Sequence, residues 1–207
     1  MASFDDMMRK GGGFAVREAS RFLMGEGKVH QSLAKIARKL TELGVPYAIA
    51  GGMALVAHGY DRTTDDVDIL VDASGLKATH DALEGLGYVA PFPGSKQLRD
   101  TETSVRIEFL VTGQFPGDGK PKPVAFPDPR NNAIEVEGIR YVAMPTLIEL
   151  KLASGMTNTG RLKDLADVQE LIRVLRLPRD FGSQLNSYVR GKYEELWQGV
   201  ADSGETS

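Results

Sequence analysis

Residues 47–72 read YAIAGGMALVAHGYDRTTDDVDILVD. An apolar run meets the glycine pair Gly51-Gly52, and a short small and apolar segment follows. A second apolar run then begins with Asp66 and Asp68 at alternate positions. This order predicts a strand, a glycine turn, a short helix, a loop and a second strand.

The two carboxylates of the second strand predict a metal site. A strand directs residues i and i+2 to the same face, so Asp66 and Asp68 point together with their Cα atoms roughly 7 Å apart. This arrangement predicts a magnesium clamp, and the alternative is an acidic strand end that faces water. Gly51 and Gly52 let the backbone approach a ligand closely, and N–H groups at the start of the following helix favour a phosphate. The stretch therefore predicts a phosphate-binding turn beside a metal site.

The glycine pair and the segment RTTDDVD at residues 62–68 resemble the signature of the DNA polymerase β-like nucleotidyltransferase superfamily. Within it, the sequence is most similar to the minimal bacterial nucleotidyltransferases that include abortive-infection and type IV toxin–antitoxin toxins. The resemblance implies a nucleoside triphosphate substrate and two Mg²⁺ ions. It also implies an RNA end such as tRNA, a protein hydroxyl or a small molecule as acceptor, and a cognate antitoxin as partner.

A third carboxylate lies in the segment SVRIEFLVT at residues 104–112, where apolar residues alternate with others and predict a strand. Three carboxylates from two adjacent strands can hold two Mg²⁺ ions roughly 4 Å apart. Asp66 and Asp68 would bridge the ions, and Glu108 would hold the catalytic ion or accept the hydroxyl proton. The superfamily more often has aspartate at the third position, so an ion pair of Glu108 with Arg106 or Arg62 is the alternative.

Cationic residues on both sides of this segment are candidates for nucleotide binding. Arg62 and Thr64 precede the carboxylates and predict contacts with a phosphate or a base, although an arginine in such a loop can equally form a surface ion pair. Farther along, Lys151 stands on an apolar helix that follows Pro145, and residues 161–167 read RLKDLAD.

This second segment resembles the second motif of the toxin-like nucleotidyltransferases. There the lysine contacts the triphosphate and the acid orients it, which the resemblance implies for Lys151 and Asp164. Lys163 and Asp167 are weaker candidates, because a solvated helix face with acids near its start explains them as well.

Composition excludes several other classes of protein. The 207 residues are 42% hydrophobic, enough for one core, and 25 basic against 28 acidic residues give a net charge of −3. This balance, with no basic recognition helix, argues against sequence-specific DNA binding. The absence of cysteine excludes disulfides and thiolate metal sites, and three scattered histidines do not predict a zinc site. No signal pattern or membrane span is visible, so we expect a cytoplasmic protein.

The remaining pattern predicts an α/β fold, a mixed β-sheet core flanked by helices with a C-terminal helical part. Helices are expected at residues 14–24, 29–43, 74–86, 146–154, 161–175 and 181–200. Further strands are expected at residues 88–90, 97–101 at a sheet edge, and 133–136 with 139–143 as a hairpin. Residues 113–132, rich in proline and glycine, are expected to form a long surface loop.

These elements divide the chain into an N-terminal extension (1–27), the nucleotidyltransferase core (28–144), a helical region (145–200) and a tail (201–207). The function that competes with nucleotidyl transfer is a non-catalytic nucleotide- or partner-binding module of the same fold, such as an antitoxin or a regulatory protein.

Overall fold

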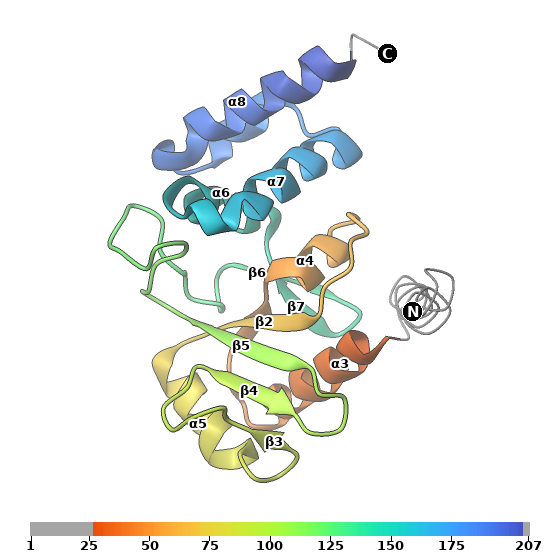
Figure 1. Ribbon diagram of the computed structural model, residues 1–207, viewed down its shortest axis with the longest axis vertical. Coiled ribbons are helices and arrows are strands. Elements are labelled where there is room, and N and C mark those ends of the chain that lie inside the picture. Colours follow the sequence, from red (N-terminus) through yellow and green to blue (C-terminus); the bar gives the residue numbers. More distant parts are fainter. Residues whose placement is uncertain (1–26, 205–207) are drawn as a thin grey trace, which may run out of the picture.

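The computed structural model describes residues 27–204, in which a sheet lies between helices and a helical part stacks at one end (Figure 1). The helix predicted at residues 14–24 lies outside the described residues, as do residues 205–207. Within residues 27–204, no helix is long and apolar enough to cross a membrane.

A mixed sheet of seven strands forms the centre of the fold, in the order β3-β4-β5-β2-β1-β7-β6. The strands are β1 (Tyr47–Ile49), β2 (Asp66–Val71), β3 (Tyr88–Val89), β4 (Gln97–Asp100), β5 (Arg106–Val111), β6 (Ala133–Val136) and β7 (Ile139–Val142). β2 pairs with β5 in parallel, as β1 does with β7, and the other neighbours are antiparallel. The two strands that carry the predicted carboxylates are therefore adjacent.

Helices pack against the sheet, and a group of three helices stacks at one end of the molecule (Figure 1). They are α3 (Lys28–Glu42), α4 (Gly51–Ala57), α5 (Ala73–Leu83), α6 (Met144–Thr157), α7 (Leu162–Leu175) and α8 (Ser187–Gly204). The last three pack on one another, and short 3₁₀ helices, η2 (Thr159–Arg161) and η3 (Arg179–Gln184), connect them. The structure confirms the predicted fold class, a mixed sheet flanked by helices with a C-terminal helical part.

One continuous hydrophobic core joins the sheet to both groups of helices. It includes Ile36 of α3, Ile69 of β2, Leu147 of α6, Leu171 of α7 and Tyr193 of α8. Burial of such side chains is the main stabilising term in folding, at about 1.5–3 kcal/mol for each fully buried large one. The C-terminal helices are thus fixed against the strands that carry the carboxylates.

The helix predicted to end at Gly155 continues to Thr157. A Cβ at Gly155 would lie 2.6 Å from Cγ of Leu165, so this glycine allows α6 to pack closely on α7. The helix predicted at residues 146–154 was therefore too short, because Gly155, which we expected to end it, lies within α6. The helix predicted at residues 181–200 begins at Ser187 and continues to Gly204, so the predicted tail is helical as far as that residue.

Three smaller predictions were also wrong: the helical period indicated that Leu86 and Leu162 are buried, and residues 97–101 were expected at a sheet edge. β4 lies between β3 and β5 and is not an edge strand. α5 ends at Leu83, which leaves Leu86 77% exposed, and Leu162 at the start of α7 is 62% exposed. Both leucines match the helical period but stand where a helix ends or begins, beyond the part that packs on the core.

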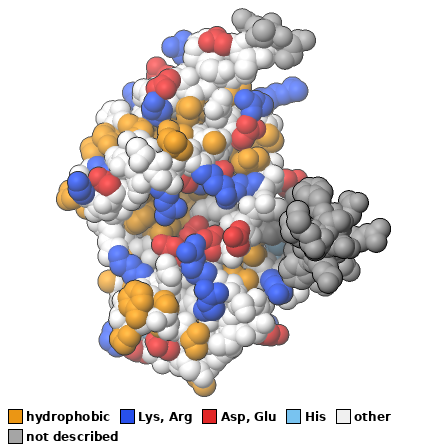
Figure 2. Space-filling model, in the orientation of Figure 1, with side chains coloured by type: hydrophobic (Ala, Val, Ile, Leu, Met, Phe, Trp, Pro, Cys, Tyr) orange, Lys and Arg blue, Asp and Glu red, His pale blue; other side chains and the backbone are white. Residues whose placement is uncertain are grey.

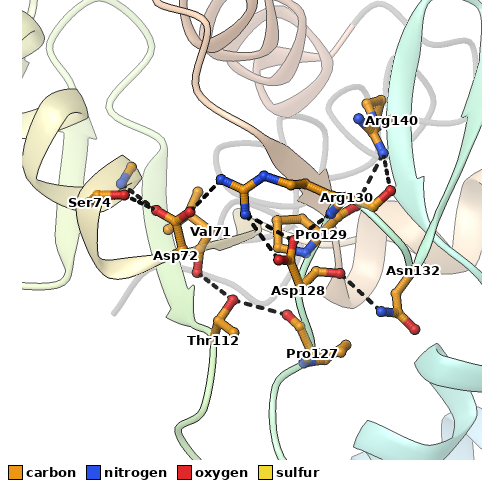
Figure 3. Close-up of polar contacts among 11 residues, drawn as sticks. Val71, Asp72, Ser74, Thr112, Pro127, Asp128, Pro129, Arg130, Asn132 and Arg140 are labelled. Atoms are coloured by element: carbon orange, nitrogen blue, oxygen red, sulfur yellow. Dashed lines mark hydrogen bonds and ion pairs between the residues drawn. The ribbon is translucent and has the colours of Figure 1, made fainter.

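The long loop at residues 113–132 is fastened to the sheet at its C-terminal side (Figure 3). Arg130 Nη2 donates to Asp72 Oδ2 over 2.8 Å, and the Thr112 hydroxyl donates to the carbonyls of Val71 and Pro127 over 3.1 and 3.0 Å. Near its other end, Asn158 Nδ2 donates to the Gly117 carbonyl over 3.2 Å. The loop is thus bound to both the sheet and the end of α6.

Candidate active site

The three predicted carboxylates lie on neighbouring strands. β2 and β5 run parallel with Asp66 opposite Arg106 and Asp68 opposite Glu108. Between Asp66 and Asp68, Val67 is fully buried on the other face of the sheet, as Ile107 is beside Glu108. The strand period therefore brings all three carboxylates to one face, as predicted.

The carboxylates differ in their protein partners. Asp66 accepts from Thr64 Oγ1 over 2.9 Å and forms an ion pair with Arg106. Within residues 27–204, the side chains of Asp68 and Glu108 have no hydrogen bond or ion pair. The predicted alternative for Glu108, an ion pair with Arg106 or Arg62, is therefore not formed.

These partners set the pKa of each aspartate. Burial, together with the neighbouring charges of Asp66 and Glu108, raises the pKa of Asp68 to about 7. Burial alone would raise the pKa of Asp66, but hydrogen bonds from Arg106 and Thr64 outweigh it and leave that pKa below its usual value. Asp68 is thus a crowded carboxylate without a protein donor, and a bound cation would relieve it.

The fit to a metal ion is good for two carboxylates and incomplete for three. No group of three or more His, Cys, Asp or Glu side chains in the described part of the chain is arranged to hold one ion. Both carboxylate oxygens of Asp66 accept hydrogen bonds, one from Thr64 and one from Arg106. Asp68 and Glu108 remain available as a pair, and Asp66 would join them only on leaving Arg106.

The glycine pair makes room for this site. Gly51 has φ +56°, and a Cβ there would lie 1.7 Å from Asp68 Oδ2. A Cβ at Gly52 would lie 2.7 Å from the Cβ of Thr64, the residue that holds Asp66. Both glycines are therefore required by the approach of site side chains, a role that the sequence interpretation as a phosphate-binding turn did not include.

The two predicted cations Arg62 and Lys151 are held by acids of α7. Lys151 Nζ donates to Asp164 Oδ1 over 2.9 Å and to Asp167 Oδ2 over 2.7 Å, and Arg62 Nη1 donates to Asp167 Oδ2 over 2.5 Å. The Ser154 hydroxyl donates to Asp164 over 2.6 Å. Lys151, which is 7% exposed, is therefore part of a buried ion-pair network and not a cation without a partner.

A polar cavity of about 450 Å³ connects these groups. Its lining includes every predicted site residue: Gly51, Gly52, Arg62, Thr64, Asp66, Asp68, Glu108, Lys151, Lys163 and Asp164. Figure 2 shows Asp and Glu side chains gathered in the middle of the visible face, with Lys and Arg side chains above and below them. The tertiary structure thus brings together residues from four separate parts of the sequence.

A smaller cavity of about 90 Å³ adjoins the polar one and shares Asp68 and Glu108 with it. Its remaining wall is largely apolar and includes Leu110, Phe126 and Leu150. Phe126 belongs to the long loop, which therefore contributes to the site. The two carboxylates without protein partners therefore line both cavities, as Lys151, Arg161 and Asp164 also do.

Sequence reasoning did not name two residues of this region, Arg161 and Arg106, as parts of the site. Arg161 lines both cavities, and its positive charge lowers the pKa of Asp68. Arg106, considered above only as a partner of Glu108, pairs with Asp66. Asp167, a weaker candidate from the sequence, belongs to the ion-pair network around Lys151. Arg161 stands in the segment RLKDLAD, and Asp167 follows Asp164 at helical spacing, so both lay within the segment that the resemblance marked.

Comparisons with known proteins give a weak structural similarity. A Helicobacter pylori protein assigned as a nucleotidyltransferase aligns with 84% of this chain and 96% of its own, at 15% identity and a TM-score of 0.43. A Thermotoga maritima protein with the same assignment covers 70% of this chain and 95% of its own, at 14% identity and a TM-score of 0.40.

The antibiotic-resistance factor ANT(2'')-Ia covers 84% of this chain and 92% of its own, at 14% identity and a TM-score of 0.43. No protein-family model and no curated protein matches the sequence.

Proposed function

We propose that this protein is a magnesium-dependent nucleotidyltransferase, which moves a nucleoside monophosphate from a nucleoside triphosphate to a hydroxyl acceptor. The observation that carries the proposal is the pair Asp68 and Glu108, in register on parallel strands and without a protein partner among the described residues. They line a polar cavity that also exposes Arg161 and Lys163, whose side chains form no ion pair or hydrogen bond with the described residues. Anionic and cationic walls around one cavity suit a magnesium–triphosphate complex.

Each wall has a role in this reaction. Asp68 and Glu108 would hold magnesium, and Asp66 would join them after exchanging Arg106. When bound, magnesium neutralises charge on the phosphate oxygens and on the attacking and leaving oxygens. Arg161 and Lys163 would bind the phosphate oxygens by charge-assisted hydrogen bonds. Arg106, released from Asp66, would add a further cation at the same edge.

The chemistry needs one bond to form and one to break. The acceptor oxygen bonds to the α-phosphorus while the bond to the leaving pyrophosphate breaks in line with it. The hydroxyl proton passes to a carboxylate, for which Glu108 is our candidate because no protein donor occupies it. In-line attack requires the acceptor to approach from the side away from the pyrophosphate, and we propose the adjoining smaller cavity for that approach.

A pyrophosphate-release assay with each nucleoside triphosphate, with and without magnesium and with total tRNA or cell extract as acceptor source, tests the proposal. We expect magnesium-dependent release with at least one triphosphate and label transferred to one acceptor fraction. Absence of release and of transfer under all of these conditions, from folded protein, would contradict it. The identity of the labelled fraction decides between RNA, protein and small-molecule acceptors.

A second candidate function is a nucleotide- or partner-binding module without catalysis. It is favoured by one observation, the engagement of both Asp66 oxygens by Thr64 and Arg106, which leaves two carboxylates for metal. Under this alternative the protein would bind magnesium–triphosphate without releasing pyrophosphate. A role as a toxin with a cognate antitoxin stays a prediction from the sequence resemblance, and co-expression with the products of adjacent genes tests it.

A further inference from the structure

We propose that Asp167 is a positioning residue that holds Arg62 and Lys151 at the polar cavity for triphosphate binding. The inference rests on the proposed function and adds a residue to it. Asp167 Oδ2 accepts from Arg62 Nη1 over 2.5 Å and from Lys151 Nζ over 2.7 Å. One oxygen thus joins the loop before β2, helix α6 and helix α7.

Burial places Asp167 behind the cations and not among the groups that a ligand would contact. Asp167 is 3% exposed and does not line the polar cavity, whereas Arg62 and Lys151 both do. A ligand in the cavity would therefore contact the two cations and not the aspartate that holds them. Asp167 would therefore act on the ligand only through the positions of Arg62 and Lys151.

Both cations keep donors for a ligand. Arg62 uses Nη1 for Asp167 and Nε for the Thr63 carbonyl at 3.3 Å, which leaves Nη2. Lys151 has three N–H donors and uses two of them, on Asp164 and Asp167. Asp167 thus fixes the direction of each side chain without consuming its full hydrogen-bonding capacity.

The charges of this network balance. Arg62 and Lys151 carry two positive charges, and Asp164 and Asp167 carry two negative charges. Removing Asp167 would leave Lys151 with one anion and Arg62 with none, in a largely buried position that disfavours an unpaired cation. Without Asp167 we expect Arg62 to turn to solvent, so that its side chain no longer lines the cavity as it does now.

The test measures the affinity of the full chain for magnesium–tripolyphosphate, an inorganic probe that needs neither the correct base nor an acceptor. Calorimetric titration should give binding about tenfold weaker for Asp167→Asn than for wild type, which corresponds to one lost charge-assisted hydrogen bond. Asp167→Glu keeps the charge but moves the carboxylate by one methylene. It should melt close to wild type and still bind the probe more weakly.

Asp100→Asn is the matched control. Asp100 is also fully buried and also accepts from two side chains, Ser32 Oγ and Lys35 Nζ, both at 3.0 Å, but it lies away from the cavity. The Asp100→Asn variant should have a lower melting temperature than wild type and the same affinity for magnesium–tripolyphosphate. Unchanged or tighter binding by both folded Asp167 variants would overturn the proposal, since a tighter complex means that Asp167 competes with the ligand. Wild-type protein that binds neither the probe nor any nucleoside triphosphate would overturn the proposed function, and this inference with it.

Discussion

Gly51 and Asp68 are in direct contact, because the backbone of the first occupies the space into which the carboxylate of the second projects. A Cβ on residue 51 would lie 1.7 Å from Asp68 Oδ2 and 2.7 Å from its Cγ. A methyl group on residue 51 would overlap the Asp68 carboxylate, and the overlap ends only if the Asp68 side chain leaves its position. The glycine and the carboxylate therefore form a single unit of the site.

Gly51→Ala should abolish turnover and lower the melting temperature, because the new methyl group displaces Asp68 and residue 51 has φ +56°. Gly44→Ala is the matched control, since Gly44 has φ +64° and nothing lies within 4 Å of the added Cβ. It should cost about 1 kcal/mol for the backbone conformation alone and leave turnover unchanged. Equal loss of activity in the two folded variants would show that backbone strain, and not contact with Asp68, explains the effect.

Asp68→Asn should abolish turnover and stabilise the protein without magnesium at alkaline pH. The pKa of Asp68 is raised to about 7, so its contribution to stability is present at low pH and is lost as the pH rises through 7. Asparagine does not ionise and avoids that loss. The loss begins at about pH 4, where the unfolded chain ionises, so thermal melts should show a larger gain of the mutant over wild type at pH 8 than at pH 5. Magnesium should raise the melting temperature of wild type and not that of the mutant.

Asp66→Asn should also abolish turnover, but with the opposite effect on stability. Asp66 forms an ion pair with Arg106, and its pKa is lowered, so loss of its charge removes a favourable interaction. We expect a lower melting temperature at pH 8. The free energy of unfolding should fall by about 1 kcal/mol or less, because Arg106 is partly exposed. A gain in stability like that of Asp68→Asn would contradict the different environments of the two aspartates.

Glu108→Gln should lose turnover while the metal-free protein keeps its stability. No side chain of the described residues donates to Glu108, so the substitution breaks no ion pair and relieves repulsion with Asp68. Thermal melts with and without magnesium, beside the pyrophosphate-release assay, check this expectation. A marked loss of stability without magnesium, or normal turnover, would remove Glu108 from the catalytic group.

Arg161→Gln and Lys163→Gln should each weaken magnesium–triphosphate binding by about 1–3 kcal/mol without a change in melting temperature, because both side chains are exposed and unpaired in the described structure.

Lys151→Ala should instead destabilise the protein by about 3–5 kcal/mol, since it leaves two acids of a buried network without their shared lysine. Calorimetry and thermal melts separate these effects. A Lys151→Ala protein as stable as wild type would show that the network contributes little.

Asp72 gives a prediction at acid pH. Hydrogen bonds from the Ser74 hydroxyl, the Gly75 backbone and Arg130 hold its pKa at about 2. Its contribution is therefore present above about pH 4 and lost as the pH falls towards 2. Asp72→Asn should destabilise the protein by about 1 kcal/mol or less at pH 7, because asparagine loses the ion pair with the partly exposed Arg130, and the difference should diminish as the pH falls towards 2. Asp81→Asn, on the exposed face of the same helix, is the control expected to change little.

The sequence by itself determined the elements whose pattern is local. Alternating apolar residues predicted β2 and β5, and the spacing of Asp66 and Asp68 predicted that they share a face, because the strand period is two residues. The helical period located α3 and α7. The mixed sheet flanked by helices was predicted from this order, aided by the resemblance of the Gly-Gly and Asp-x-Asp motifs to a known superfamily.

Only the tertiary structure decided which charged groups pair. Whether Arg106 meets Glu108 or Asp66 depends on strand register, and the structure places it beside Asp66. Whether Lys151 is free or buried depends on how α7 packs on α6, which the close contact at Gly155 sets. Hydrophobic periodicity encodes which face of an element is buried, whereas an ion pair requires two distant segments to meet within a few ångströms. That distance is a property of the packed core, and no local pattern in the chain contains it.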